Sequence, residues 1–404
     1  MQVNENCCPM LLKLLLLTAC LLVVYFAGRA LVYHLTRKSR LLVLIGDLRA
    51  QHAGLPALPA FSRTVGRELD LTYKHQGRWQ RQVRRADLSL STTATLPLRP
   101  VCPPLPYAKG LILVGDHAIG LWAQDNWQWR HPIQYSAISG HKIRPVIHSS
   151  RLFYPESRLL MNKLGKSAPA ALKVFNLDQD GAVDLELPLP YIKTRYGWLS
   201  GADTSVTADG DRLYLGLHDG TIKCLDTATL QTIWQYAVPL SKGNYKKRVD
   251  FEGDLLLHKD MIIAAAEGSF YLLSKANGSL AGMFPFFQMP LSYVVRDQGI
   301  LFASFSRLYA YSFADKQITV QTNIRHPYLF ISPYTQGYVV VGTSRPRAGS
   351  PFWRPVDGYV YVLDHKLNVR HSGRVAFWAG PDVHVIDGRL LLLTTKQELL
   401  SIRL

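Results

Sequence analysis

The sequence predicts an all-β fold made of one repeated unit, and three observations support this prediction. Apolar and polar residues alternate from Arg212 to Leu217, so that Leu213, Leu215 and Leu217 share one face, which is the pattern of a half-buried strand. Asp-Gly and Asn-Gly pairs, which close tight hairpins, stand between such stretches. Similar stretches then recur along the chain at a nearly constant interval.

The most complete unit is Ala208–Tyr236. Its alternating pattern predicts strands over residues 212–217, 221–226 and 231–236, and each is separated from the next by a turn. Trp234 lies near the end of the last strand, where a large aromatic ring can cover the edge of the sheet. An antiparallel unit of this size cannot bury both of its faces alone, so it needs neighbours of the same kind.

Copies of this unit give the period. Residues Glu267–Ser274 and Asp357–Asp364 repeat the pattern of Asp219–Asp226, and the glycines Gly220 and Gly268 are 48 residues apart. The next clear copy begins 90 residues later, which is two steps of 45. A four-stranded unit at this period predicts a β-propeller rather than a helical repeat.

Seven blades are predicted within residues 105–404, and eight blades are the alternative, with the hairpin Arg67–Val83 as part of the extra blade. Residues 37–104 are expected to hold a basic juxtamembrane region and the strands that close the ring. A propeller must cover its last edge. We therefore expect residues 88–98 to pair with the final strand, residues 399–404.

Residues 1–36 differ in composition from the rest. Met10–Leu35 is apolar except for Lys13, Arg29 and His34, and its uncharged centre is Leu14–Gly28. A helix of that centre spans about 22 Å, which is shorter than the roughly 30 Å core of a bilayer. Because Lys13 and Arg29 can extend towards the headgroups, the whole segment predicts an N-terminal transmembrane helix.

Two other interpretations of the N-terminal segment remain open. Gly28-Arg29-Ala30 offers small residues at the spacing of a signal-peptide cleavage site. The run Leu17–Cys20 is similar to a bacterial lipoprotein box, in which Cys20 would be lipidated.

Basic residues are concentrated near this segment. The first 100 residues hold 14 Lys and Arg against 5 Asp and Glu, and Arg37, Lys38 and Arg40 follow the apolar stretch directly. These three are candidates to bind lipid headgroups. The positive-inside rule would leave the propeller in the cytoplasm.

The repeat carries a resemblance to a known family. A strand, the pattern Asp-Gly-x-apolar-x-x-Leu-Asp, a turn and then Trp, shown most fully by Asp211–Trp234, resembles the quinoprotein-type (PQQ-like) propeller repeat. Within that group the chain is similar to the propeller lipoproteins of the outer-membrane β-barrel assembly machinery. The resemblance implies an exported, periplasmic propeller that binds protein partners.

Candidate chemistry is sparse, and we expect no catalytic residue, metal site or cofactor. Quinone enzymes of the resembling family use a disulfide between adjacent cysteines, whereas the one adjacent pair here, Cys7-Cys8, precedes the propeller. Cys102 and Cys224 are expected to be small core residues. Nucleic acid is an unlikely partner on sequence grounds, because no nucleic-acid-binding motif accompanies the net charge of +17.

One expected loop breaks the repeat and predicts a partner site. Residues 345–356 replace a tight turn and combine three arginines with two aromatic residues, a composition typical of binding hot spots. The candidates are Arg345, Arg347, Phe352, Trp353 and Arg354. Together these features predict a membrane-anchored, non-catalytic scaffold of the cell envelope; the alternative is an enzyme with a site in the central channel, either a diverged quinoprotein dehydrogenase or a carbohydrate-active propeller.

Overall fold

A computed structural model describes the strands and most of their connections. It covers residues 50–57, 59–133, 143–160, 169–194, 197–240, 249–286, 292–304, 307–324, 328–343, 358–375, 378–394 and 397–404. The chain divides into two compact units, residues 1–43 and 44–404, and all described residues belong to the second. Within these ranges no helix is long and apolar enough to cross a membrane. The predicted N-terminal helix lies outside them.

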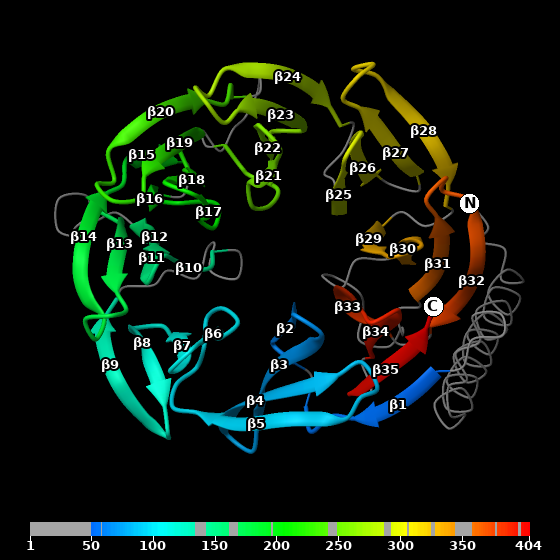
Figure 1. Ribbon diagram of the computed structural model, residues 1–404, viewed down its shortest axis with the longest axis horizontal. Coiled ribbons are helices and arrows are strands. Elements are labelled where there is room, and N and C mark those ends of the chain that lie inside the picture. Colours follow the sequence, from blue (N-terminus) through cyan, green and yellow to red (C-terminus); the bar gives the residue numbers. More distant parts are fainter. Residues whose placement is uncertain are drawn as a thin grey trace, which may run out of the picture. The chain divides into compact units, whose positions relative to one another are not determined.

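The strands form eight four-stranded antiparallel blades that follow one another around a ring (Figure 1). In each blade the first strand is innermost and the fourth is outermost. Blades 1 to 4 are β2 (Phe61–Val65), β3 (Glu68–His75), β4 (Arg78–Arg85) and β5 (Leu90–Leu96); β6 (Leu105–Tyr107), β7 (Gly110–Val114), β8 (Ala118–Ala123) and β9 (Asn126–Pro132); β10 (Val146–His148), β11 (Arg151–Pro155), β13 (Ala171–Asn176) and β14 (Ala182–Pro188); and β17 (Thr207–Asp209), β18 (Arg212–Gly216), β19 (Thr221–Asp226) and β20 (Thr232–Ala237).

The remaining blades continue the same order. Blades 5 to 8 are β21 (Leu256–His258), β22 (Met261–Ala266), β23 (Ser269–Ser274) and β24 (Leu280–Pro285); β25 (Ser292–Arg296), β26 (Gly299–Ser304), β27 (Arg307–Ser312) and β28 (Ile318–Asn323); β29 (Tyr328–Tyr334), β30 (Gly337–Thr343), β31 (Gly358–Asp364) and β32 (Val369–Val375); and β33 (Trp378–Ile386), β34 (Arg389–Thr394), β35 (Glu398–Arg403) and β1 (Ala50–Gly54). A further sheet, β12 (Ser157–Leu160), β16 (Gly197–Gly201) and β15 (Tyr191–Thr194), accompanies blade 3.

The all-β propeller is confirmed, but the predicted number of seven blades is wrong. The eighth blade is the one that we kept as the alternative, because the hairpin Arg67–Val83 provides most of β3 and β4. The pattern Asp-Gly-x-apolar-x-x-Leu-Asp is absent from this blade. The repeat signature therefore missed it, although its alternating residues Leu69, Leu71 and Tyr73 are fully buried.

The predicted ring-closing strand is also wrong. Residues 90–96 form β5, which pairs with β4 inside blade 1. The ring is closed instead by β1, whose Ala50–Gly54 pairs with β35 from Ile402 to Glu398. The physical reason is the short connection between β4 and β5, which favours a hairpin with the preceding strand over a distant pairing.

Each of the outermost strands in blades 1 to 7 contains an irregularity in its pairing with the third strand. In blade 4, Cys224 faces Trp234 and Leu225 faces Thr232, so that Ile233 is the extra residue of a β-bulge. Bulges twist an edge strand and interrupt its regular hydrogen bonding, which discourages pairing with another molecule. The outer edges of these blades are therefore poor templates for strand addition.

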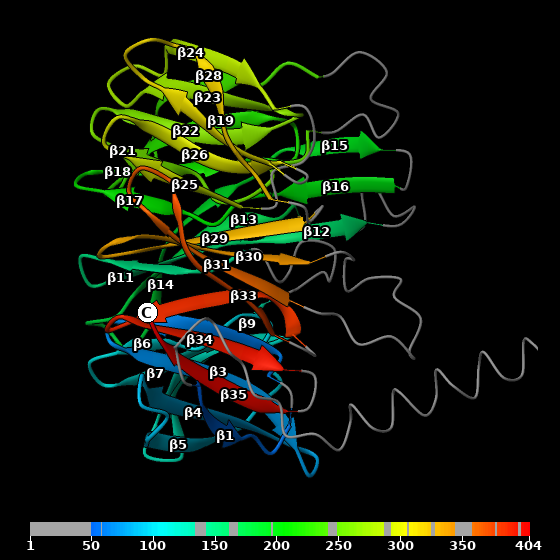
Figure 2. The same ribbon diagram turned by 90° about the vertical axis from the view of Figure 1, so that its right-hand side faces the viewer.

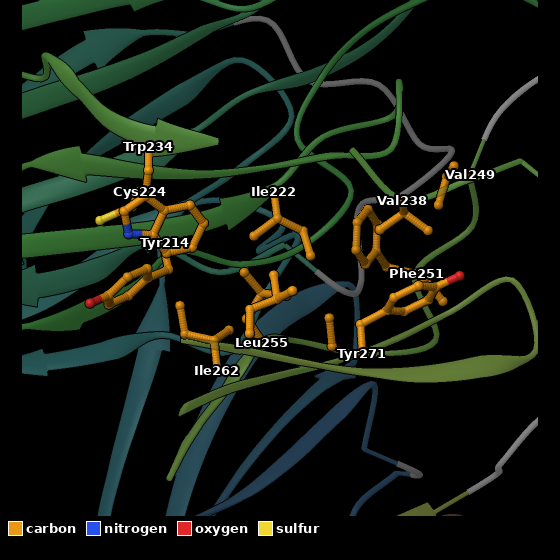
Figure 3. Packing of buried hydrophobic residues seen from close by; sticks show 13 residues of the cluster. Tyr214, Ile222, Cys224, Trp234, Val238, Val249, Phe251, Leu255, Ile262 and Tyr271 are labelled. Carbon is orange, nitrogen blue, oxygen red and sulfur yellow. The ribbon is translucent and has the colours of Figure 1, made fainter. Parts of the chain in front are cut away.

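Adjacent blades are joined by residues that the repeat places at corresponding positions. Trp234 of blade 4 packs against Tyr214 and Cys224 (Figure 3), and its Nε1 donates a hydrogen bond to the Lys275 carbonyl of blade 5 at 3.0 Å. Gly278, at φ +70°, lies directly against the indole, so that a side chain there would enter the ring. The predicted capping tryptophan is thus the contact between two blades.

Aspartates stabilise the turns between third and fourth strands. The Asp364 carboxylate accepts hydrogen bonds from the backbone amides of Lys366 and Asn368 at 2.9 Å, and from the Asn368 side chain at 3.1 Å. Arg370 lies 2.7 Å from the same carboxylate. The Asn368 side-chain bond is the largest cause that lowers the pKa of Asp364, which reaches about 2.

Replacing the contact residue tests how blades 4 and 5 are joined. Trp234→Ala should lower the free energy of unfolding by about 3–5 kcal/mol, because it empties a buried site and removes an interblade hydrogen bond. Ile233→Ala changes the neighbouring residue, which is 44% exposed, and should change that free energy by less than about 0.5 kcal/mol. Urea unfolding of the two variants measures both; equal effects would show that the indole does not join the blades.

The turn aspartate predicts a pH dependence. The folded pKa of Asp364 is about 2, below the value of about 3.9 in an unfolded chain. The stabilisation is therefore fully present above about pH 4 and disappears as the pH falls through the folded pKa. The difference in unfolding midpoint between wild type and Asp364→Asn should be largest near neutral pH and shrink towards pH 2; a difference that stays constant would contradict the assignment.

Candidate functional site

Blade 3 departs from the repeat by continuing beyond the ring. After β11 the chain passes through Glu156 directly into β12, which pairs with β16 from Ser157↔Gly201 to Leu160↔Trp198. The strand β15 pairs with β16 to complete a three-stranded sheet. Figure 2 shows β12, β15 and β16 extending beyond the blades on one side of the ring. We call these three strands the projecting sheet.

A close approach of two backbones fixes the base of the projecting sheet. Gly201 has φ +114°, and a Cβ at this position would overlap the Glu156 carbonyl. The Ala202 amide donates a hydrogen bond to that same carbonyl at 3.0 Å. Only glycine fits this conformation and this spacing, so the residue determines where the projecting sheet leaves blade 3.

Buried polar side chains lie beneath the projecting sheet. Glu156 is fully buried; its Oε2 accepts a hydrogen bond from the Ala171 amide at 3.1 Å, and its Oε1 lies 3.3 Å from Nζ of Lys173. Ser200, also fully buried, accepts from the Ala170 amide at 3.0 Å. A buried carboxylate is tolerated only when such partners replace water. These contacts tie the base of the sheet to β13.

A second set of contacts runs from blade 3 to blade 5. Ser157 Oγ lies 2.8 Å from Nε2 of His218, and Nδ1 of His218 lies 3.3 Å from Oδ1 of Asp203. The Phe251 amide donates to Oδ2 of Asp203 at 2.9 Å. Ser157 belongs to β12, Asp203 and His218 flank β17 and β18, and Phe251 precedes β21. We call Ser157, His218 and Asp203 the polar relay.

Serine, histidine and aspartate linked in this order form the catalytic triad of some enzymes. There the serine is the nucleophile, the histidine is its general base, and the aspartate orients the histidine. In this protein the three side chains are 7%, 2% and 7% exposed, and the second oxygen of Asp203 binds a backbone amide. A reacting serine must reach its substrate, whereas a structural relay must be shielded from water. The burial therefore favours a structural role, in which the relay holds blades 3, 4 and 5 beneath the projecting sheet.

Further hydrogen bonds strengthen this part of the ring. The Ser205 amide donates to Oδ1 of Asp254 at 2.8 Å, and the Arg144 amide donates to Ser205 Oγ at 3.0 Å. Thr207 Oγ1 donates to the Leu255 carbonyl at 3.0 Å. Each bond joins one blade to the next, so the base of the projecting sheet is a rigid platform.

The site residues predicted from the sequence all lie outside the described residues. The partner candidates Arg345, Arg347, Phe352, Trp353 and Arg354 belong to residues 344–357, between β30 and β31. The headgroup candidates Arg37, Lys38 and Arg40, and the possible lipidation site Cys20, precede Ala50. Their roles stay predictions.

The two cysteines of the propeller are buried and unbridged, as expected for small core residues. Burial raises the pKa of Cys102 to about 12, against the opposing charges of Arg144 and Arg63. Burial likewise raises the pKa of Cys224 to about 11. Among the residues that the structure describes, no group of three or more His, Cys, Asp or Glu could hold a metal ion.

Sequence reasoning missed the residues beneath the projecting sheet. The repeat pattern Asp-Gly-x-apolar-x-x-Leu-Asp is absent around Glu156 and Ser157, and Asp203 and His218 are far from them in the sequence. One signal in the sequence could have found them. The stretch from Arg151 to Thr207 is longer than the rest of one blade and its connection to the next blade require.

No family model matches the chain, and none of the curated proteins compared with it matches either. Solved structures do match the chain. The computationally designed Ika8 protein matches with a TM-score of 0.57 and 11% identity, over 87% of this chain and 97% of that one. BamB from Moraxella catarrhalis gives 0.44 and 15%, over 78% and 100%, and the Pan2 WD40 domain of Neurospora crassa gives 0.43 and 12%, over 86% and 89%. Of these, the similarity to the Ika8 protein supports the fold alone.

The structural role of the polar relay predicts a loss of stability. Ser157→Ala should lower the free energy of unfolding by about 1–3 kcal/mol, because it removes the buried hydrogen bond between Ser157 Oγ and Nε2 of His218. Ser279→Ala, in an exposed turn, should change it by less than about 0.5 kcal/mol. Urea unfolding of the whole chain compares them, and an unchanged midpoint for Ser157→Ala would exclude the relay as a structural element.

Proposed function

We propose that this protein is a membrane-anchored, non-catalytic propeller that acts as a protein-binding scaffold in the cell envelope, with a role in outer-membrane protein assembly. The propeller fold supports the scaffold, because propellers present connecting segments on a rigid ring. The observation that carries the proposal is the projecting sheet, which extends the ring on one side over a buried polar platform. The membrane anchor rests on the sequence of residues 1–40. The extracytoplasmic location rests on the resemblance of the repeat to exported quinoprotein-type propellers, against the positive-inside rule.

The projecting sheet has the properties of a binding surface. It adds β15 and β16 to one side of the ring, and its base is held by Glu156 and the polar relay. On this sheet Lys193 lies over the Trp198 ring, with Nζ 6.0 Å from the ring centre. A cation and an aromatic ring on a rigid strand are groups that anchor protein interfaces.

The predicted partner segment begins and ends on the same side of the ring. Strand β30 runs to Thr343 and β31 returns from Gly358, and these two are the second and third strands of blade 7. The projecting sheet likewise continues the second strand of blade 3. Because corresponding strands of a propeller run in the same direction, residues 344–357 are attached on the side from which the projecting sheet extends. A partner on that side could therefore contact both.

Crosslinking in living cells tests whether this side of the ring is the binding surface. A photoreactive residue in place of Lys193 should form a discrete crosslinked product with an envelope protein. The matched control is the same residue at Gln179, in the exposed turn between β13 and β14 at the opposite ends of the strands; it should not form that product. Identical products from both positions would contradict the proposed surface, and modification of Ser157 by a fluorophosphonate would favour the enzyme.

The partner segment predicts a separation of binding from stability. Changing Trp353 and Arg354 together to alanine should weaken capture of the crosslinked partner by about 2 kcal/mol or more, since such residues dominate interface energetics. The melting temperature should stay close to that of wild type. Met283→Ala, an exposed apolar residue on β24, is the control. Lost stability with unchanged capture per folded molecule would refute the hot spot.

A further inference from the structure

Exposed cations gather on one side of the ring. We call the side from which the projecting sheet extends the projecting side; the second strand of a blade ends there and its first strand begins there. Among the described residues of blades 1 to 3 and of the projecting sheet, six exposed Lys or Arg side chains lie at or near this side: Lys74, Arg78, Arg99, Arg130, Arg144 and Lys193.

The strand directions place these six cations together. Two of them flank the turn between β3 and β4, and one is near the end of β9, the outermost strand of blade 2. Two more lie in the connections that enter β6 and β10, and the last is on β15 of the projecting sheet. They therefore share one side of three successive blades, although they are far apart in the sequence.

None of the six cations is neutralised by a carboxylate among the residues that the structure describes. Several cations on the opposite side of the ring do have such partners. There Nζ of Lys275 lies 2.6 Å from Oδ2 of Asp209, and Nη2 of Arg151 lies 3.1 Å from Oδ2 of Asp184. The charges on the projecting side are therefore free to bind an external partner.

The described acids near these cations do not offset their charge. Asp116 and Glu186 are half-buried and lie at or near the projecting side of blades 2 and 3, and neither forms an ion pair with one of the six cations. Glu156 is fully buried and pairs with Lys173 at 3.3 Å. The projecting side of blades 1 to 3 consequently carries an excess of positive charge.

Two of the cations are held in place by aromatic rings. The Arg130 guanidinium lies over Trp127, with Cζ 5.6 Å from the ring centre, and Nζ of Lys193 lies 6.0 Å from the centre of Trp198. Both cations remain exposed. A cation that rests on a ring loses less freedom when it binds an anion, because its position is already restricted.

We propose that this basic surface binds an acidic segment of the partner protein. The inference rests on the proposed scaffold function and adds the chemistry of its partner. Carboxylates pair with arginine through two parallel hydrogen bonds and with lysine as a point charge. Complementary charge of this kind accelerates association and selects among partners.

The shape of the projecting side favours a polypeptide over a membrane surface. Strands β12 and β15 have four residues each, so each is roughly 13 Å long, and Figure 2 shows them extending beyond the blades. A flat bilayer would meet the projecting sheet first. Its headgroups would then lie farther from the blade ends than the screening length of about 8 Å at physiological ionic strength. A polypeptide segment can lie on the blade ends beside the sheet.

Binding of an acidic peptide to the full-length protein in a non-ionic detergent tests the proposal. The probe is a fluorescein-labelled peptide in which glutamate alternates with glycine, and fluorescence anisotropy gives its dissociation constant. Arg78→Glu together with Arg99→Glu should raise that constant about tenfold or more, because two attractive contacts become repulsive. Binding to wild type should also weaken when the ionic strength rises from about 0.1 M to about 1 M, since the screening length falls from about 10 Å to about 3 Å.

The matched control reverses two exposed cations on the opposite side of the same blades. Arg85→Glu together with Lys109→Glu changes the net charge equally and should alter the dissociation constant by less than about twofold. Both pairs are at exposed positions and should keep the wild-type melting temperature. If the first pair prevents folding, Arg78→Gln with Arg99→Gln should raise the constant about threefold. Equal weakening by the test and control pairs, or a wild type that does not bind the peptide, would overturn the proposal.

Competition distinguishes an acidic polypeptide from other polyanions. Unlabelled peptide, phosphatidylglycerol vesicles and an oligothymidine are each added at the same concentration of negative charge, and the peptide should displace the probe best. Stronger displacement by the vesicles would assign the surface to a membrane, and stronger displacement by the oligothymidine would assign it to nucleic acid. Either result would overturn the proposal.

The crosslink at position 193 separates this inference from the proposed function. If that position yields a product with an envelope protein while the peptide does not bind, the scaffold stands and the acidic partner is refuted. If the peptide binds with the expected dependence on Arg78 and Arg99 while no crosslinked product forms, the basic surface stands and the scaffold is refuted.

Discussion

The pairing of β1 with β35 is the constraint on which the rest of the ring depends. Each blade has two faces, and it buries each of them against a neighbour, so that every blade needs two others. At the closing contact, Leu69 and Leu71 of blade 1 share a buried cluster with Leu391 and Leu399 of blade 8. Ser401 of β35 donates a hydrogen bond to the Ala86 carbonyl of blade 1 at 2.6 Å. The five residues of β1 thus complete blade 8. Loss of this blade would expose the two interfaces that it forms with blades 7 and 1.

Most of the fold could be predicted because its signals are local. The alternation from Arg212 to Leu217 and the turn at Asp219-Gly220 indicate strand, turn and strand within one short stretch. Blade 1 was harder to predict from the sequence, since its strands β3 and β4 are joined by Gln76-Gly77 and lack the repeat signature. The closing strand could not be predicted from the sequence, because Ala50 and Ile402 are at opposite ends of the chain. Nothing in Ala50–Gly54 indicates which strand it pairs with.

The candidate site could not be predicted for a related reason. Ser157, Asp203 and His218 become neighbours only after blades 3 and 4 have packed together. No local motif marks them. The predicted break in the repeat was residues 345–356, whereas the structure shows a departure between Arg151 and Thr207, which becomes the projecting sheet. A regular ring therefore supplies rigidity, while the irregular segments on one side supply a surface that differs from blade to blade.

Hydrogen exchange of the β35 amides tests ring closure most directly. The Leu55 amide donates to the Gln397 carbonyl, so along β1 the Ala53 amide points to β35 and the His52 amide points away. Ala53→Pro should therefore open the closing pair, and exchange should accelerate throughout β33, β34 and β35. His52→Pro, on the outer edge, should leave exchange in these strands nearly unchanged. Equal protection of β35 in the two variants would contradict closure by β1.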